Sequence, residues 1–228
     1  MRIVLDLQGA QSESSRSRGI GRYSLALAEA IAREAGRHEV WVALNGGVPD
    51  SIEPLRATLT GLISPERIRA FELPMPVAEL DLANSWRMQA AELLREKFLA
   101  DLQPDIVHVS TLFEGAGNEV VASVGRLNTK VPTAVTLYDL IPMLRPSSYL
   151  ANPLLKRSYL RRIQSLKRAD LESPLRKDYA SAVVSAIRVH RLTPNPAKTV
   201  DETDHTLVGR RNRVRGIKMP RSIRIGYV

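Results

Sequence analysis

The chain has 228 residues, a formal net charge of +9 and no cysteine. That length allows one large domain or two small ones, and the lack of cysteine excludes a disulfide framework and a thiolate metal site. No apolar run approaches the roughly 20 residues that a membrane span needs, and the first residues lack a signal-peptide pattern. We therefore expect a cytoplasmic protein.

The predicted elements alternate along the chain. Apolar runs predict strands at residues 3–7, 39–44, 67–74 and 106–110 and within 131–142. Helical periodicity predicts helices at 19–35, 51–62, 82–102, 118–124 and 153–168. The expected apolar stripe of the 82–102 helix consists of Trp86, Ala90, Leu93 and Leu94. This alternation predicts an α/β fold, a Rossmann-like doubly wound parallel sheet covered on both faces.

The end of the chain differs from the rest. Residues 171–228 hold 12 Lys and Arg against 5 Asp and Glu, whereas residues 1–170 hold 21 against 19. From residue 192 onward no helix or strand period is visible, so we expect an irregular basic tail. Such a tail can attract nucleic acid or anionic lipid. Nucleic-acid binding is the less favoured interpretation, because Tyr227 is the only aromatic residue after Tyr179 and no recognised module is present.

The loop after the first strand is the first candidate site, because ligands of doubly wound sheets bind beyond the carboxyl ends of the strands. Gly19 and Gly21 stand at the start of a predicted helix, where free backbone N–H groups favour an anion, and Arg22 adds charge. The spacing matches neither a Walker loop nor a dinucleotide fingerprint. A simple turn at a helix start remains an equal alternative.

Other polar residues lie in or after the later strands. His108 interrupts an apolar strand. A histidine that is buried in the core and hydrogen-bonded there is its commoner explanation. Glu114-Gly115 and Tyr138-Asp139 follow strand ends, where an acidic residue can also act as a helix cap. No group has metal-ligand spacing, so no metal is expected, and no nucleophile elbow is present. No catalytic residue is assigned.

Four segments carry a resemblance: "RIVLDLQGAQS", "RGIGRYSLALAEAI", "PDIVHVSTLFEG" and "TLYDLIPMLRPSSYL". In this order they resemble the N-terminal domain of family 4 retaining glycosyltransferases with the GT-B fold, and are similar to bacterial mannosyltransferases of O-antigen and other surface polysaccharides. The resemblance covers about residues 1–171. It implies two Rossmann-like domains facing a cleft, of which the N-terminal one mostly holds the acceptor and the C-terminal one the nucleotide sugar.

The resemblance also implies site roles. Gly19, Gly21 and Arg22 would face the donor phosphates, and the acceptor side of the cleft would contain His108, Glu114, Gly115, Tyr138 and Asp139. Many members have His-Asp where this chain has Tyr138-Asp139, so the role of that histidine is not transferred to the tyrosine. The implied reaction needs no metal or other cofactor. It moves a hexose, with mannose favoured, from a nucleotide-diphosphate sugar such as GDP-mannose to a lipid-linked or glycan acceptor.

The chain departs from this family after residue 171. Relatives continue with an apolar strand and a donor domain, whereas Leu171 here runs into "ESPLR", where we expect no strand. The donor domain's glutamate pair is also missing, because Glu202 is the only glutamate after Glu172. We therefore divide the chain into an acceptor-side domain, 1–171, and a divergent basic tail, 172–228, interpreted as truncated or out of frame. The chain alone is expected to be inactive, and a non-catalytic interaction protein is the alternative.

The helix at 153–168 is basic around an apolar stripe. The stripe is Leu155, Tyr159, Ile163 and Leu166, and the cations around it are Lys156, Arg157, Arg161, Arg162, Lys167 and Arg168. Contact with anionic lipid at the inner face of the membrane is one interpretation. An ordinary surface helix whose stripe packs on the sheet is favoured over it.

Overall fold

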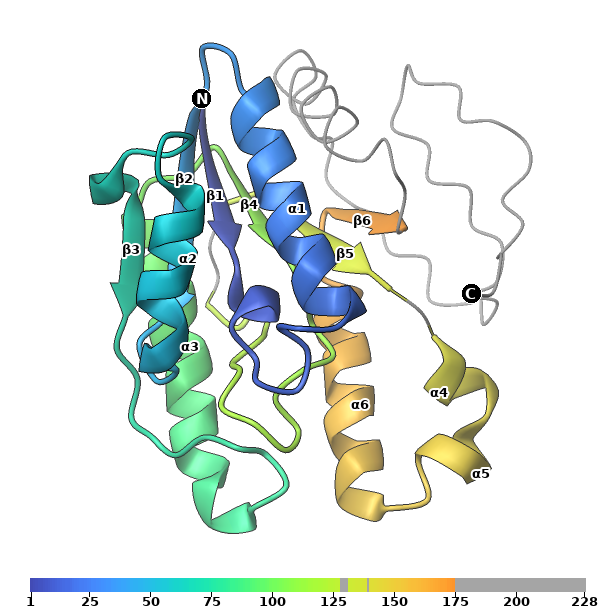
Figure 1. Cartoon of the computed structure of the whole chain (residues 1–228). Helices are drawn as coiled ribbons and strands as arrows, with labels where there is room; N and C mark the ends of the chain where they lie inside the picture. The colour runs from blue at the N-terminus through green and yellow to red at the C-terminus, as the bar shows by residue number, and fades with distance from the viewer. Residues whose placement is uncertain (128–130, 139, 175–228) are drawn as a thin grey trace, which may run out of the picture.

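The computed structural model of the chain describes residues 1–127, 131–138 and 140–174, the last four of these as backbone. It contains a parallel sheet of six strands in the order β3-β2-β1-β4-β5-β6 (Figure 1). The strands are β1 Arg2–Asp6, β2 Glu39–Asn45, β3 Ile68–Phe71, β4 Ile106–Val109, β5 Thr133–Leu137 and β6 Leu171–Pro174. The predicted α/β doubly wound fold is confirmed.

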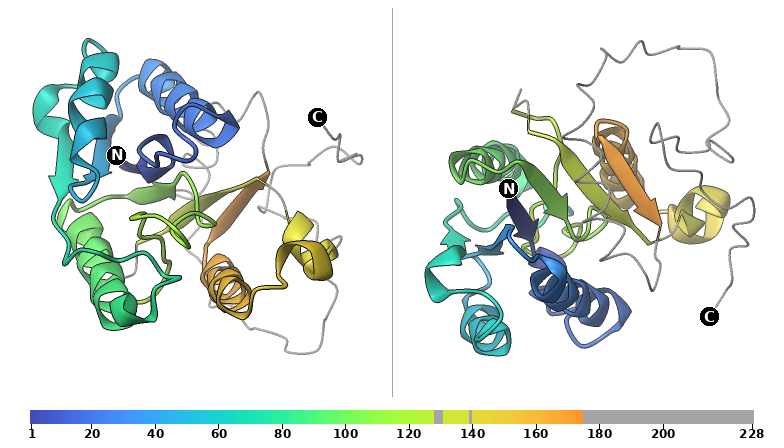
Figure 2. Two further views of the ribbon diagram at one scale, coloured as in Figure 1. Left: turned by 60° about the horizontal axis from the view of Figure 1, so that its bottom comes forward. Right: turned by 90° about the horizontal axis from the view of Figure 1, so that it is seen from above.

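Helices cover both faces of the sheet (Figure 2). On one face lie α1 Gly19–Glu34 and α2 Ile52–Leu59, and on the other lie α3 Ser85–Asp101 and α6 Pro153–Leu166. Two short helices, α4 Ile141–Leu144 and α5 Pro146–Tyr149, connect β5 to α6. Single 3₁₀ turns occur at Gln8–Ala10, Pro49–Ser51, Pro65–Arg67 and Leu82–Asn84. The connections before α1, α3 and α6 all lie at the carboxyl edge of the sheet (Figure 1).

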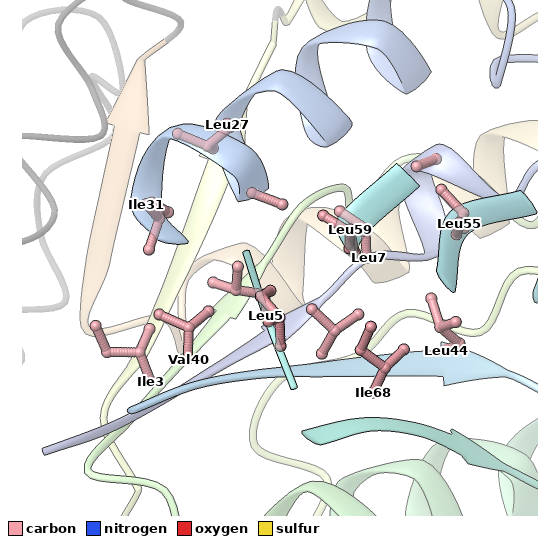
Figure 3. Packing of buried hydrophobic residues seen from close by; sticks show 14 of the residues in the cluster. Ile3, Leu5, Leu7, Leu27, Ile31, Val40, Leu44, Leu55, Leu59 and Ile68 are labelled. Atoms are coloured by element: carbon pink, nitrogen blue, oxygen red, sulfur yellow. The ribbon is translucent and has the colours of Figure 1, made fainter. Parts of the chain in front are cut away.

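The largest core fills the space between the sheet and helices α1 and α2 (Figure 3). Ile3 and Leu5 of β1 are at most 1% exposed and contribute to it together with Leu27 and Ile31 of α1 and Leu59 of α2. Val4, between them, belongs to a second cluster on the α3 side. A strand buried on both faces is typical of a parallel sheet, which explains why β1 is apolar at three consecutive positions.

The predicted stripe of α3 is wrong. Trp86 is 63% exposed and Leu94 49% exposed, whereas the buried face includes Ala91, Glu92 and Arg95. The charged side chains can be buried because each is ion-paired, Arg95 with Asp6 and Glu92 with Arg161 and Arg126. Met88 and Leu99 on this face pack in apolar clusters, but a hydrophobic pattern cannot reveal that the charged positions between them are buried.

The predicted helix at 118–124 is also wrong, because this segment is an irregular loop. Its backbone forms hydrogen bonds with two buried amide side chains, that of Gln8, which follows β1, and that of Asn45, the last residue of β2. Gln8 Oε1 accepts from Val121 N at 3.0 Å, Gln8 Nε2 donates to the Val121 carbonyl at 2.7 Å, and Asn45 Nδ2 donates to the Glu119 carbonyl at 2.8 Å. These long-range hydrogen bonds occupy backbone N–H and C=O groups that would have bonded to one another in a helix.

A third correction concerns β6. Its backbone pairs in parallel with β5, with Ala134 opposite Leu171 and Leu137 opposite Pro174, although no strand was expected there. Backbone pairing at a sheet edge does not require the apolar run on which the prediction depended. The proposed boundary at residue 171 stays a prediction, and residues 175–228 lie outside the described part.

Candidate functional site

Two loops from distant parts of the chain meet at the carboxyl edge of the sheet. Glu114 Oε2, after β4, accepts from Ser12 Oγ at 3.0 Å and from Asn118 Nδ2 at 3.0 Å. Gly9 N donates to Ser110 Oγ at 3.2 Å. The structure thus joins the loop after β1 to the loop after β4, and it holds the Glu114 carboxylate between them.

The N-terminus of α1 leaves backbone donors available. In the part of the chain that the structure describes, no acceptor lies within hydrogen-bonding distance of the Gly19 or Ile20 N–H, and no side chain caps the helix. Gly19 is exposed, and a Cβ built on it would meet nothing within 4 Å. Arg22 is exposed one turn along. Unbonded N–H groups, the helix dipole and a neighbouring guanidinium favour an anion.

Gly21 has a different role from Gly19. Its N–H donates to the Ser15 carbonyl at 3.1 Å, so it is already bonded. A Cβ at Gly21 would lie 2.3 Å from Arg16 Cα and 2.4 Å from the Ser15 carbonyl oxygen. Glycine is needed here because the preceding loop crosses directly against the first turn of α1. Of the two glycines, one leaves a donor open and the other allows a close backbone approach.

Tyr138 lies beside this helix terminus. Its hydroxyl donates to the Ile20 carbonyl at 3.3 Å and lies 3.1 Å from Ser24 Oγ. Its ring meets Tyr23 edge to face at 5.9 Å between centroids. Burial raises the pKa of Tyr138 to about 12, so the group is a neutral phenol near pH 7. Asp139 lies outside the described residues.

His108 and Gly115 are placed away from open surface. His108 is 2% exposed within β4, with Nε2 2.9 Å from Thr136 Oγ1, which favours the core-histidine interpretation. Gly115 is buried with φ +93°, and a Cβ there would lie 2.1 Å from the Val120 carbonyl oxygen. Gly115 therefore shapes the loop that carries Glu114 rather than exposing a group to a ligand.

The sequence also matches a known protein family. The family described as "Glycosyl transferase 4-like domain" matches residues 18–172. The chain belongs to this family.

Relatives of this glycosyl transferase 4-like chain include a "Serotype-specific mannosyltransferase WbdA" from Escherichia coli, 34% identical over 185 residues. A second Escherichia coli protein of that name is 30% identical over 159 residues. The matches cover 81% and 69% of this chain but 22% and 20% of the relatives, so the chain spans about a fifth of their length. Among solved structures, a UDP-GlcNAc 2-epimerase from Neisseria meningitidis aligns with a TM-score of 0.40 and 14% identity, over 85% of this chain and 51% of the epimerase.

This glycosyl transferase 4-like domain contains a buried ion pair, next to the start of the loop after β1, that was not predicted from the sequence. Asp6 ends β1 and is 1% exposed, and Arg95 of α3 is fully buried. Arg95 Nε donates to Asp6 Oδ2 at 2.7 Å, and Arg95 Nη1 donates to the Ser123 carbonyl at 3.1 Å. Asp6 Oδ1 accepts from Gln8 Nε2 at 3.1 Å. An aspartate ending an apolar strand was the one available signal, but its partner lies 89 residues away.

The basic helix α6 is an ordinary surface helix for most of its length. Tyr159, Ile163 and Leu166 of the predicted stripe are buried. Arg162 is also buried, and its Nη2 lies 2.9 Å from Glu79 Oε2. Arg161 pairs with Glu79 and Glu92. These two cations are therefore engaged by carboxylates, which weakens the lipid-contact interpretation of the whole helix.

Residues 1–127, 131–138 and 140–174 contain neither a metal-binding group nor a membrane-spanning helix. No group of three or more His, Asp and Glu side chains there is placed to hold a metal ion. No helix there combines the length and apolarity needed to cross a membrane.

His108 predicts a pH dependence of stability. Burial lowers its pKa from 6.5 to about 4, so the folded state favours the neutral ring. The stabilisation is complete above pH 6.5 and is lost as the pH falls towards 4, by roughly 2 kcal/mol between pH 7 and pH 4.5. Urea unfolding at both pH values measures this, with His108→Gln as the comparison. Because glutamine does not titrate, the loss should be smaller in the variant, and an equal loss would exclude His108 as its source.

Proposed function

We propose that the chain forms the acceptor-side domain of a retaining hexosyltransferase that uses a nucleotide-diphosphate sugar. The observation that carries this proposal is the exposed start of α1, where the Gly19 and Ile20 N–H groups have no acceptor among the described residues and Arg22 is adjacent. Membership of the glycosyl transferase 4-like family supports it. The names of the Escherichia coli relatives favour mannose as the transferred sugar. GDP-mannose as donor and a lipid-linked or glycan acceptor are further parts of the proposal.

In this proposal the α1 terminus and the two joined loops have separate tasks. The donor diphosphate accepts hydrogen bonds from the Gly19 and Ile20 amides and is attracted by Arg22. The Glu114 carboxylate, held in place by Ser12 and Asn118, accepts hydrogen bonds from acceptor hydroxyl groups. No residue of this chain is assigned to the chemical step.

The donor contact is too weak to act alone. A helix dipole at an exposed anion contributes about 0.3–1 kcal/mol, whereas micromolar affinity requires about 8 kcal/mol. Retaining transfer also requires stabilisation of the charge that develops on the leaving diphosphate. One helix terminus and one arginine supply only part of that, so further groups must face the same phosphates during the reaction.

The expected result of a transfer assay is therefore no turnover by this chain. The purified chain is incubated with GDP-mannose and a mannose-terminated glycan acceptor, and release of GDP is followed. A full-length mannosyltransferase relative serves as the positive control for donor and acceptor. Turnover by the isolated chain that Arg22→Ala abolishes would show that this domain suffices and would overturn the expectation of inactivity.

A further inference from the structure

A cleft is lined by residues of α3, of α6 and of nearby loops. Both helices cover the face of the sheet opposite α1 (Figure 2). The volume of the cleft is about 200 Å³, well above the ~15 Å³ that a single water needs. Polar and charged side chains from both helices and from the loops between strands line it together with two leucines; the six that matter here are Glu79, Leu82, Arg126, Leu154, Arg157 and Arg161.

The charges around this cleft do not balance. One carboxylate, Glu79, and three guanidinium groups line it, and the buried Glu92 and Arg162 pair with these lining residues from behind. Arg161 pairs with both carboxylates, and the remaining pairs are Arg162 with Glu79 and Arg126 with Glu92. Arg157, the other arginine that lines the cleft, has no hydrogen-bond or ion-pair partner among residues 1–127, 131–138 and 140–170. The cleft therefore carries an excess of positive charge.

One guanidinium nitrogen beside the cleft is buried and has no acceptor in the described part of the chain. Arg161 Nη2 has no hydrogen-bond partner among the described residues, although its Nε donates to Glu79 Oε1 at 2.8 Å. A buried guanidinium N–H without an acceptor costs free energy, and a small rotation of the Arg161 side chain towards the cleft would let a bound phosphate accept from it. Glu79 and Glu92 hold the Arg161 side chain, which is 29% exposed, in position before any ligand arrives. The exposed Arg157 side chain lies one turn away on the same helix.

We propose that the cleft between α3 and α6 binds a phosphate group, which accepts hydrogen bonds from Arg157 and Arg161. Guanidinium groups bind phosphate oxygens with matched planar geometry. Leu82 and Leu154 give the cleft an apolar side against which the uncharged part of the phosphate-bearing molecule packs. This site lies on a different face from the α1 terminus and does not depend on the proposed sugar transfer.

The test is a titration of the ¹⁵N-labelled chain with inorganic phosphate, following the Nε–Hε resonances of Arg157 and Arg161. Both are expected to shift with one saturation curve. Arg157→Gln should weaken phosphate binding about tenfold, the effect of losing one charge-assisted bond. Arg157 has no partner in the described structure to lose, so folding should be unchanged. Lys156→Gln removes an equal charge from the same exposed helix and should leave the affinity unchanged.

A second arm identifies the source of the phosphate. Vesicles containing phosphatidic acid are compared with phosphatidylcholine vesicles in co-sedimentation with the wild-type chain and with Arg157→Gln. Binding that needs phosphatidic acid and Arg157 assigns a lipid headgroup, while phosphate binding without vesicle binding assigns a soluble phosphoester. Equal weakening by Lys156→Gln and Arg157→Gln, or no Arg157-dependent binding in either arm, overturns the proposal.

Discussion

Arg95→Met is expected to lower the free energy of unfolding by about 3–5 kcal/mol, the usual cost of removing one partner of a buried ion pair. Arg95 is fully buried, and Asp6 is 1% exposed. Without the guanidinium, the Asp6 carboxylate would keep, among the described residues, only the bonds from Gln8. The Ser123 carbonyl would also lose its donor, so the loop after β4 should loosen. Urea unfolding at pH 7 measures the change.

The matched control is an ion pair on the same helix at the surface. Lys97 pairs with Asp101, and both side chains are about 60% exposed. Lys97→Met should change stability by less than about 1 kcal/mol, because solvent screens exposed pairs. The double variant Asp6→Asn with Arg95→Met should recover part of the loss, because no buried charge remains. A loss below about 1 kcal/mol for Arg95→Met would contradict the assigned role of this pair.

Gly21→Ala should have the second large effect. The new methyl group would lie 2.3 Å from Arg16 Cα and 2.4 Å from the Ser15 carbonyl oxygen, so the loop before α1 must move. Overpacking of this kind costs about 1–3 kcal/mol, and here the clash is with backbone, which cannot rotate away. We expect a net loss of roughly 2 kcal/mol, because alanine's helix propensity offsets part of the strain.

Gly19→Ala provides the comparison, two residues away on the same helix. Its Cβ would meet nothing within 4 Å, so stability should be unchanged or slightly raised. Thermal unfolding of both variants separates the two glycines. Equal melting temperatures for Gly19→Ala and Gly21→Ala would show that the close approach of the loop to α1 does not contribute to stability.

The sequence predicted the framework of the fold well where local pattern and burial agree. β1 is apolar because both its faces are covered, and α1 ends before Gly36, whose φ of +56° is the usual helix-stop conformation. The segments 19–35 and 153–168 were predicted within two residues of α1 and α6. In each of these helices, the periodic apolar residues and the residues that end the helix are close together in the sequence, so a local pattern is enough to predict it.

The parts that were missed depend on partners far away in the sequence. Nothing near residues 118–124 indicates that Gln8 and Asn45 bond their backbone and prevent a helix. The buried face of α3 could not be predicted because the partners that allow Arg95 to be buried, Asp6 and the Ser123 carbonyl, are distant in the sequence. Gly19 and Gly21 are the same residue type two positions apart, and only the packing of the preceding loop distinguishes them.

The central claim, that the start of α1 binds the diphosphate of a sugar donor, is tested most directly by titrating the ¹⁵N-labelled chain with GDP-mannose. The backbone amide resonances of Gly19 and Ile20 are followed in the wild-type chain and in Arg22→Ala. We predict that both resonances shift together with a millimolar dissociation constant, a free energy of about 4 kcal/mol, because two charge-assisted amide hydrogen bonds and the Arg22 charge add to the dipole contribution. Arg22→Ala should weaken this binding severalfold. Saturable binding of GDP-mannose that leaves both amides unshifted, or no binding at this site at donor concentrations above 10 mM, roughly tenfold beyond that dissociation constant, would contradict the claim.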